Sequence, residues 1–146
     1  MLWKNGAKKM SDFLLDSGIL ILQLRNQPGY IALLEQLSDQ GMLFISTMTR
    51  FEILQGMKER ERKKTFETLE VLESLPVVDD IAEKAGELVR DWRAKGVTLG
   101  IADALIAATA LQHNLALVTT NPRHFPMPEL TVYQADDAGK MTLCQR

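Results

Sequence analysis

Residues 100–120 read GIADALIAATALQHNLALVTT, and this stretch decides the fold. Its first half is unusually rich in small side chains, because it contains Ala102, Ala104, Ala107, Ala108 and Ala110. The pattern predicts a helix from Gly100 to about His113 that can approach a sheet closely. The run ALVTT at residues 116–120 predicts a strand directly after that helix.

The rest of the chain continues this alternation of strands and helices. Further strands are expected at residues 13–15, 43–46, 77–78 and 131–133. Further helices are expected at residues 18–24, at 30–39, from about Thr49 to Gly56, at 58–75 before Pro76, and at 80–95. Such an alternation predicts an α/β sandwich on a mostly parallel sheet.

Length and composition point to one ordinary globular domain. The 146 residues fall near the commonest domain size, and the net charge of -2 neither favours nor excludes a nucleic-acid partner. Cys144 is the only cysteine, which excludes an internal disulfide and fits a reducing cytoplasm. No run approaches the ~18 apolar residues of a membrane span. We therefore expect a cytoplasmic protein with no membrane partner.

The N-terminus faintly resembles a signal peptide, because the basic segment MLWKNGAKK precedes the apolar segment FLLDSGILIL. Asp12 and Asp16 interrupt the apolar part, and no A-x-A cleavage pattern follows, so we expect no export. Met10 opens a more natural start, MSDFLLD. Residues 1–10 are therefore expected to be an extension, and residues 11–146 to form the domain.

Three acidic residues lie just past a predicted strand or just inside a predicted helix: Asp16, Glu52 and Asp103. If the fold brings them together, two like charges about 4 Å apart repel by roughly 4 kcal/mol at an effective dielectric of about 20. Such a cluster is tolerable only if protons or a hard divalent cation neutralise it. Because Mg²⁺ and Mn²⁺ prefer carboxylate oxygens, the pattern predicts a metal site.

Each acidic residue also has a structural interpretation. Asp16 precedes Ser17 and Gly18, which suits a helix N-cap. Glu52 lies three residues after Thr49, as in a capping box, and a glutamate held in a cap would be a poorer metal ligand. Asp103 gains from the helix dipole, yet a charge on an apolar helix is costly without a partner, which favours a functional role.

Two further segments carry polar or basic residues. In the loop after residues 116–120, Asn121 is a candidate for holding a water or a phosphate, and Arg123 for pairing with a phosphate, although a plain Asn-Pro turn also fits. His113 and His124 show no paired ligand spacing, so we expect neither to bind metal. The basic run at residues 58–64 fits a solvated helix face or a nucleic-acid-facing edge.

Together, four segments resemble the PIN domain family, and within it the VapC-type toxins of bacterial toxin–antitoxin pairs. They are FLLDSGIL, ISTMTRFEILQGM, GIADALIAATAL and LVTTNPRHF, and the resemblance spans about residues 11–134. It implies a three-layer α/β/α fold and a Mg²⁺- or Mn²⁺-dependent endoribonuclease. It also implies a catalytic site of Asp16, Glu52 and Asp103, with Asp16 and Asp103 as the metal ligands.

The chain departs from this family at one position. Many PIN domains carry a fourth acidic residue where this sequence has NPRHF, which offers Asn121 and His124 instead. We expect Asn121, rather than His124, to be the fourth site residue. Glu52 would complete the metal shell or orient the attacking water.

The resemblance also implies partners: a structured RNA substrate such as tRNA, a VapB-like antitoxin and a second copy of the chain. The main alternative is a catalytically silent PIN-like module that binds RNA or protein. A phosphotransfer receiver domain is disfavoured because Leu15 and Ser17 flank Asp16 and TTNPRHF has no lysine. A haloacid-dehalogenase-type enzyme is disfavoured because Gly18 replaces the second acid of Asp-x-Asp.

Overall fold

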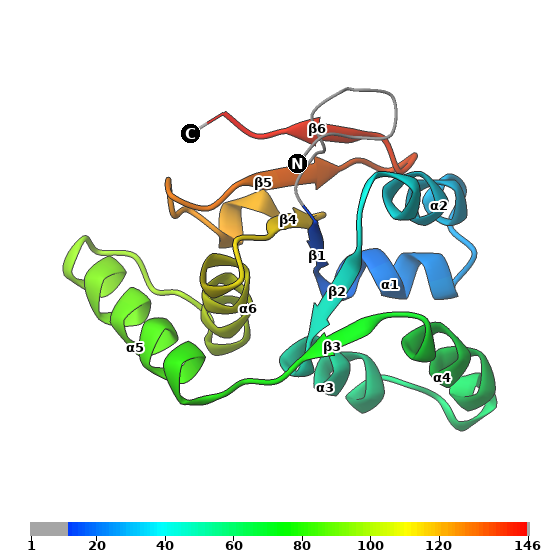
Figure 1. The fold of residues 1–146 in the computed structure, drawn as a ribbon, viewed down its shortest axis with the longest axis horizontal. Helices are drawn as coiled ribbons and strands as arrows, with labels where there is room; N and C mark the ends of the chain where they lie inside the picture. Colours follow the sequence, from blue (N-terminus) through cyan, green and yellow to red (C-terminus); the bar gives the residue numbers. More distant parts are fainter. Residues whose placement is uncertain (1–11, 146) are drawn as a thin grey trace.

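The computed structural model describes residues 12–145, which form one six-stranded sheet with helices on both faces (Figure 1). The strands are β1 (Phe13–Leu15), β2 (Leu43–Ser46), β3 (Glu73–Leu75), β4 (Ala116–Thr119), β5 (Val132–Ala135) and β6 (Met141–Leu143). The helices are α1 (Ser17–Leu24), α2 (Tyr30–Gln40), α3 (Thr47–Gln55), α4 (Arg62–Glu70), α5 (Asp79–Ala94) and α6 (Ile101–Gln112), with short 3-10 turns η1 (Glu59–Glu61) and η2 (Pro122–His124). The proposed extension at residues 1–10 lies outside the described residues.

The strand order is β3-β2-β1-β4-β5-β6, and every pairing except that of β5 with β6 is parallel. The mostly parallel α/β/α arrangement expected from the sequence is therefore confirmed. The first strand of the chain is central, since β1 pairs with β2 on one side and with β4 on the other. The chain direction across the sheet reverses at this point, and ligands of open α/β sheets bind at the carboxyl ends of strands beside such a reversal.

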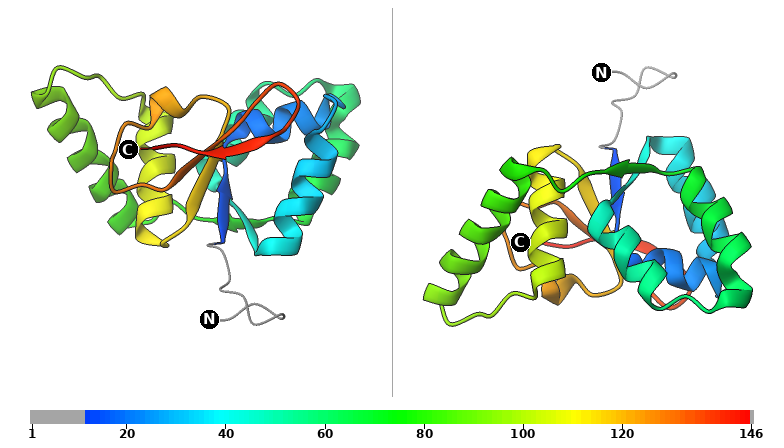
Figure 2. Two further views of the ribbon diagram at one scale, coloured as in Figure 1. Left: turned by 90° about the horizontal axis from the view of Figure 1, so that it is seen from above. Right: turned by 90° about the horizontal axis from the view of Figure 1, so that it is seen from below.

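Two apolar clusters fill the spaces between the layers. Successive residues of a strand face opposite sides of a sheet, so Leu14 packs under α5 and α6 while Phe13 and Leu15 pack under α1, α2 and α4. Figure 2 shows these two groups of helices on opposite sides of the sheet. Among the described helices, none is long and apolar enough to cross a membrane.

The segment at residues 58–75 differs from the single long helix that the sequence predicted. The helix ends at Glu70, and Glu73–Leu75 forms β3, which pairs in parallel with β2. The strand predicted at residues 77–78 is absent, and these residues lead into α5. Pairing with the open edge of β2 satisfies the backbone groups of ESL, so tertiary context overrides the local helical pattern.

The C-terminal region also extends the predicted sheet. The last predicted strand is shifted to Val132–Ala135, and β6, which we had not predicted, pairs with it. The loop between the two strands holds α2 in place, because Tyr30 Oη donates a hydrogen bond to the Asp136 carbonyl at 2.8 Å.

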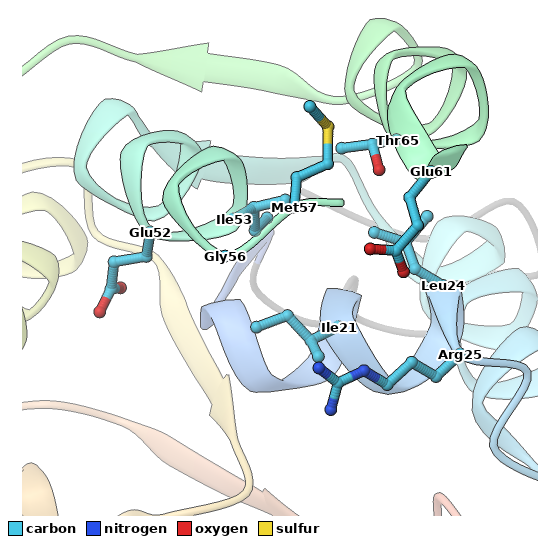
Figure 3. Close-up of a pocket in the computed structure, with 9 residues that line it drawn as sticks. All are labelled: Ile21, Leu24, Arg25, Glu52, Ile53, Gly56, Met57, Glu61 and Thr65. Atoms are coloured by element: carbon cyan, nitrogen blue, oxygen red, sulfur yellow. The ribbon is translucent and has the colours of Figure 1, made fainter. Parts of the chain in front are cut away.

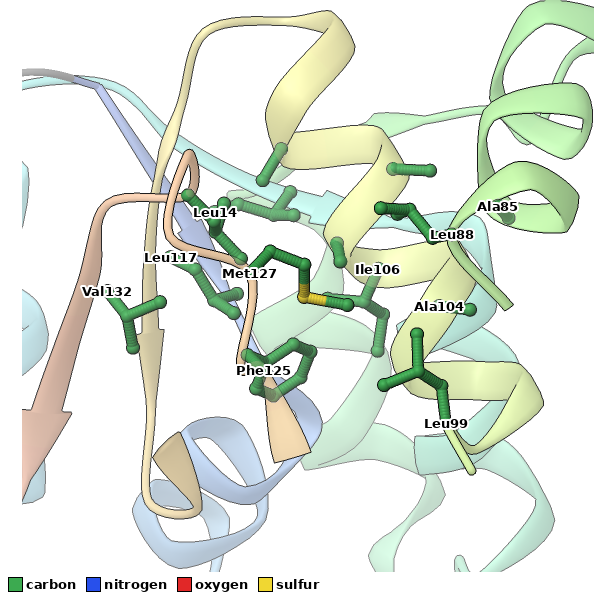
Figure 4. Close-up of a cluster of buried hydrophobic side chains, with 14 of the residues drawn as sticks. Leu14, Ala85, Leu88, Leu99, Ala104, Ile106, Leu117, Phe125, Met127 and Val132 are labelled. Carbon is green, nitrogen blue, oxygen red and sulfur yellow. The ribbon is translucent and has the colours of Figure 1, made fainter. Parts of the chain in front are cut away.

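Helix α6 packs closely on the sheet, as its alanines predicted. Ala104, Ala107, Ala108 and Ala110 are buried, and α6 also contacts α5 along its length. Figure 4 shows Ala104 and Ile106 of this helix among Leu14 and Leu117 of the sheet and Leu88 of α5.

Because no space remains around Ala107, we expect Ala107→Leu to lower the free energy of unfolding by about 1–3 kcal/mol. Ala82→Leu on the exposed face of α5 is the matched control and should change stability by less than about 0.5 kcal/mol. Urea unfolding followed by circular dichroism measures both. Equal effects of the two substitutions would contradict close packing of α6.

Candidate metal-dependent active site

Asp16 lies at the carboxyl end of β1 and connects three elements. It is the N-cap of α1: its Oδ1 accepts a hydrogen bond from Ser17 N at 2.9 Å, so the predicted capping role is confirmed. Its Oδ2 accepts a hydrogen bond from the hydroxyl of Thr119, at the end of β4, at 2.7 Å. Asp16 is only 8% exposed, and its charge acts on both Glu52 and Asp103.

Glu52 is not part of a capping box, so that structural alternative is wrong. Helix α3 begins at Thr47, and its N-cap is Ser46, whose hydroxyl accepts a hydrogen bond from Met48 N at 3.0 Å. Thr49 is already inside the helix, where its buried hydroxyl has no hydrogen-bond partner among the described residues. The serine that ends β2 is better placed to cap α3 than a residue in its first turn.

The side chain of Glu52 is therefore available for chemistry. It is half-buried, and its Oε1 makes no hydrogen bond within the described part of the chain. A buried carboxylate oxygen without a partner is costly, and such exceptions in a native fold call for a missing partner such as a water or an ion.

Asp103 lies in the first turn of α6, where the helix dipole stabilises its charge. The glycine that precedes the helix leaves room for it, since a Cβ at Gly100 would lie 2.9 Å from Asp103 Oδ2. On its other side, His124 Nδ1 lies 3.5 Å from the same oxygen. Asp103 is thus held between the start of α6 and the turn η2.

The pKa values show that the structure brings the three acidic residues together. Burial raises the pKa of Asp16, of Glu52 and of Asp103 above their ordinary values. The charge of Asp16 raises the pKa of Glu52 and of Asp103 further, and Asp103 also raises the pKa of Glu52. Hydrogen bonds from Thr119 and Ser17 and the nearby His124 oppose the rise in the pKa of Asp16.

Asn121 lies beside this cluster in the loop after β4. Its side chain is exposed, and its amide donates a hydrogen bond to the Thr120 hydroxyl at 3.4 Å. Its backbone N–H donates to Thr119 Oγ1 at 3.0 Å, so the hydroxyl that holds Asp16 also holds the loop. The catalytic role of Asn121 stays a prediction.

The sequence analysis did not predict that two residues, Thr119 and His124, contact the acidic residues. Thr119 was recognised only as part of a strand, although a polar residue at the carboxyl end of a buried strand is a usable signal. His124 was expected to be an ordinary surface residue from its spacing, and it is 57% exposed but faces Asp103. Only the folded position of η2 shows this contact.

The donor set fits a hard divalent cation that keeps part of its water shell. Within residues 12–145, no three or more histidine, cysteine or acidic side chains are already arranged around one ion position. Mg²⁺ is commonly held by only one or two carboxylates, with waters and a substrate phosphate completing its shell. Asp16 and Asp103 would supply those carboxylates, and the mutual repulsion and the unpartnered Glu52 Oε1 favour a cation here.

These raised pKa values predict how stability depends on pH in the metal-free protein. A carboxyl whose pKa is raised on folding contributes stability that is fully present below its unfolded value and is lost as the pH rises through the folded value. We therefore expect the melting temperature to rise as the pH falls from neutral towards the unfolded values of 3.8 and 4.5. Asp16→Asn should raise the melting temperature at neutral pH and flatten this profile.

Differential scanning fluorimetry in the presence of a chelator measures the effect. Asp80→Asn, at an exposed position of α5, is the control and should keep the wild-type profile. A strongly destabilised Asp16→Asn protein would instead mean that Asp16 acts mainly as a structural cap.

An open α/β sheet with acidic residues gathered at the carboxyl ends of its central strands is the arrangement of the PIN domain. The model of this family matches residues 13–128, so the chain belongs to the PIN domain family. Ribonuclease VapC10 of Mycobacterium tuberculosis is 36% identical over 116 residues, which cover 80% of this chain and 87% of that protein. Ribonuclease VapC19 of the same organism is 37% identical over 119 residues, which cover 80% of this chain and 95% of that protein. The chain therefore belongs to the VapC group.

Solved structures give the same result. The VapBC2 complex of Rickettsia felis bound to a promoter DNA fragment matches with a TM-score of 0.78 and 28% identity, covering 85% of this chain and 98% of that one. The DNA-bound VapBC complex of Salmonella typhimurium matches with a TM-score of 0.70 and 27% identity, covering 84% and 97%. The family resemblance inferred from the sequence is confirmed.

Proposed function

We propose that this protein is a metal-dependent endoribonuclease that acts as the toxin of a toxin–antitoxin pair. The observation that carries the proposal is the convergence of Asp16, Glu52 and Asp103: the charge of Asp16 raises the pKa values of the other two, and the charge of Asp103 also raises that of Glu52. The relatives named as VapC ribonucleases support the reaction class. Mg²⁺, or Mn²⁺ in its place, is the cofactor we propose.

Each residue has a distinct task in this proposal. Asp16 and Asp103 hold the cation, which when bound supplies the charge that polarises the scissile phosphate and makes a water easier to deprotonate. Glu52 orients the attacking water and its carboxylate accepts the proton, since a carboxyl with a raised pKa is suited to general base catalysis near neutral pH. Asn121 contacts the phosphate or a bound water from the loop after β4.

Thr119 and His124 position these groups. The Thr119 hydroxyl fixes Asp16 and leaves its remaining lone pairs for the cation. His124 lies next to Asp103, with Nδ1 3.5 Å from Oδ2, and keeps that carboxylate oriented.

The partners are also proposals. Structural neighbours that are VapBC complexes support a VapB-like antitoxin, whose segment would cover the acidic site. A tRNA substrate is supported by the tRNA(fMet)-specific endonuclease VapC of Shigella flexneri, which is 29% identical over 123 residues. A homodimer is supported by the exposed apolar side chains of Phe51 on α3 and Ile101 on α6, two helices in mutual contact. A cytoplasmic location remains the prediction made from Cys144.

Titration of Mn²⁺ into the wild type and Asp103→Asn by calorimetry, with RNA cleavage assayed on the same samples, tests the metal site. We expect binding and cleavage in the wild type and the loss of both in the variant. Metal should also raise the melting temperature of the wild type alone, because a ligand of the folded state stabilises it. Absence of binding by folded wild type would contradict the metal site, and binding without cleavage of any RNA would leave a silent PIN-like module.

Glu52→Gln separates the proton acceptor from the metal ligands. We expect cleavage to fall by about 10²–10⁴-fold while Mn²⁺ binding and the melting temperature are kept, because Glu52 has no capping role. Glu67→Gln on the exposed face of α4 is the matched control and should cleave normally. Loss of metal binding in Glu52→Gln would make Glu52 a metal ligand instead.

A further inference from the structure

A small cavity lies next to Glu52, between α1, α3 and the start of α4. Its volume is about 70 Å³ and it opens to solvent, so it is a shallow cleft that can take one edge of a ring but not a whole ligand. Its walls are mainly apolar, formed by Ile21 and Leu24 of α1, Ile53 of α3 and Met57 beyond it. Figure 3 shows Glu52 at one side of this cavity, with its carboxylate turned away from the other lining residues.

Two charged side chains at the cavity have capacity for a ligand. The Arg25 side chain forms no hydrogen bond or ion pair with any residue from 12 to 145, and it runs back beneath Ile21 along α1 (Figure 3). Glu61 uses only Oε1, which accepts a hydrogen bond from Lys58 N at 2.8 Å. Its carboxylate reaches from η1 towards Leu24 (Figure 3). The cavity therefore has the N–H donors of Arg25 and a free carboxylate oxygen of Glu61 at the edges of an apolar surface.

Further basic side chains lie beside this cavity. A second cavity shares Leu24, Glu61 and Thr65 with the first and is lined in addition by Arg60 and Lys64. Lys64 Nζ is held in place by the Leu24 carbonyl at 2.9 Å and by Asn26 Oδ1 at 3.1 Å. A polyanionic strand that leaves the acidic site past Glu52 would meet these basic side chains next, and Lys and Arg side chains neutralise backbone phosphates.

We propose that this cavity binds one unstacked guanine of the RNA, next to the scissile phosphate, and that Arg25 reads it; the proposal rests on the ribonuclease function proposed above. The cleft is shallow, so one edge of the base would enter it while the rest of the base stays outside its mouth. Single-stranded RNA is read through bases that are splayed out and hydrogen-bonded on their edges. The bidentate contact of arginine with guanine O6 and N7 is the commonest specific contact to a base, and Glu61 is placed to accept from the N–H groups of guanine.

Sequencing of cut sites in a pool of random RNA tests the proposal with the full-length protein and Mn²⁺. The wild type should prefer guanine at one position beside the cut. Arg25→Ala should reduce that preference by about tenfold or more while cleavage at non-guanine sites is kept. Arg90→Ala, on the exposed surface of α5, removes the same charge and should keep the preference.

A second variant fills the cavity without touching Arg25. Gly56 lines it, and a Cβ there would meet only the Glu52 carbonyl, at 3.9 Å, so the first atom of a side chain is accommodated at this position. Gly56→Leu should weaken the guanine preference with an unchanged melting temperature.

Binding of the free nucleoside separates this proposal from the ribonuclease function. Guanosine carries no charge and needs no metal, so it should shift the NMR signals of the Met57 and Ile53 methyl groups in the wild type but not in Arg25→Ala. These shifts without cleavage of any RNA would support the base site and overturn the ribonuclease function. Cleavage with a flat preference beside the cut would overturn the base site alone. If Arg25→Ala weakens antitoxin binding but keeps the cut-site preference, the cavity belongs to the protein partner and the proposal is also overturned.

Discussion

The hydrogen bond between Thr119 Oγ1 and Asp16 Oδ2 is the contact on which the rest of the site depends. It joins the ends of β1 and β4, the two strands at which the sheet reverses direction. The same carboxylate caps α1, and the same hydroxyl receives the backbone N–H of Asn121. One buried pair therefore fixes two strands, a helix and a loop, so the functional carboxylate is positioned by the main architecture of the fold.

The acidic site lowers the stability of the metal-free protein. Burial raises the pKa values of Asp16, Glu52 and Asp103, and the charge of Asp16 raises those of Glu52 and Asp103 further, so each carboxylate is unfavourable as a charged group at neutral pH. The buried hydroxyl of Thr49 and the Glu52 Oε1 without a partner add to this cost. Large apolar clusters on both faces of the sheet offset it, and active sites are commonly destabilised in this way relative to a redesigned core.

Much of this was accessible from the sequence, because the relevant signals are local. The alanine-rich helix and β2 at residues 43–46 followed from pattern and spacing, whereas the grouping of the three acidic residues in one site was implied by the family resemblance. The capping box at Thr49 and the long helix at 58–75 failed for a shared reason. Both errors arise from β2. Ser46, the last residue of β2, caps α3 in place of Thr49, and residues Glu73–Leu75 pair with the edge of β2 instead of continuing the helix. Pairing partners of this kind cannot be found from a local window.

The central position of β1 has a consequence for how the protein is made. The neighbour of β1 on one side is β4, so the two paired strands leave the ribosome more than a hundred positions apart. Synthesis at about 5–20 residues per second leaves this first strand half-paired for several seconds, and Asp16 without Thr119. Maturation of the site therefore waits for the synthesis of β4, and a nascent chain that stops before residue 119 cannot assemble it.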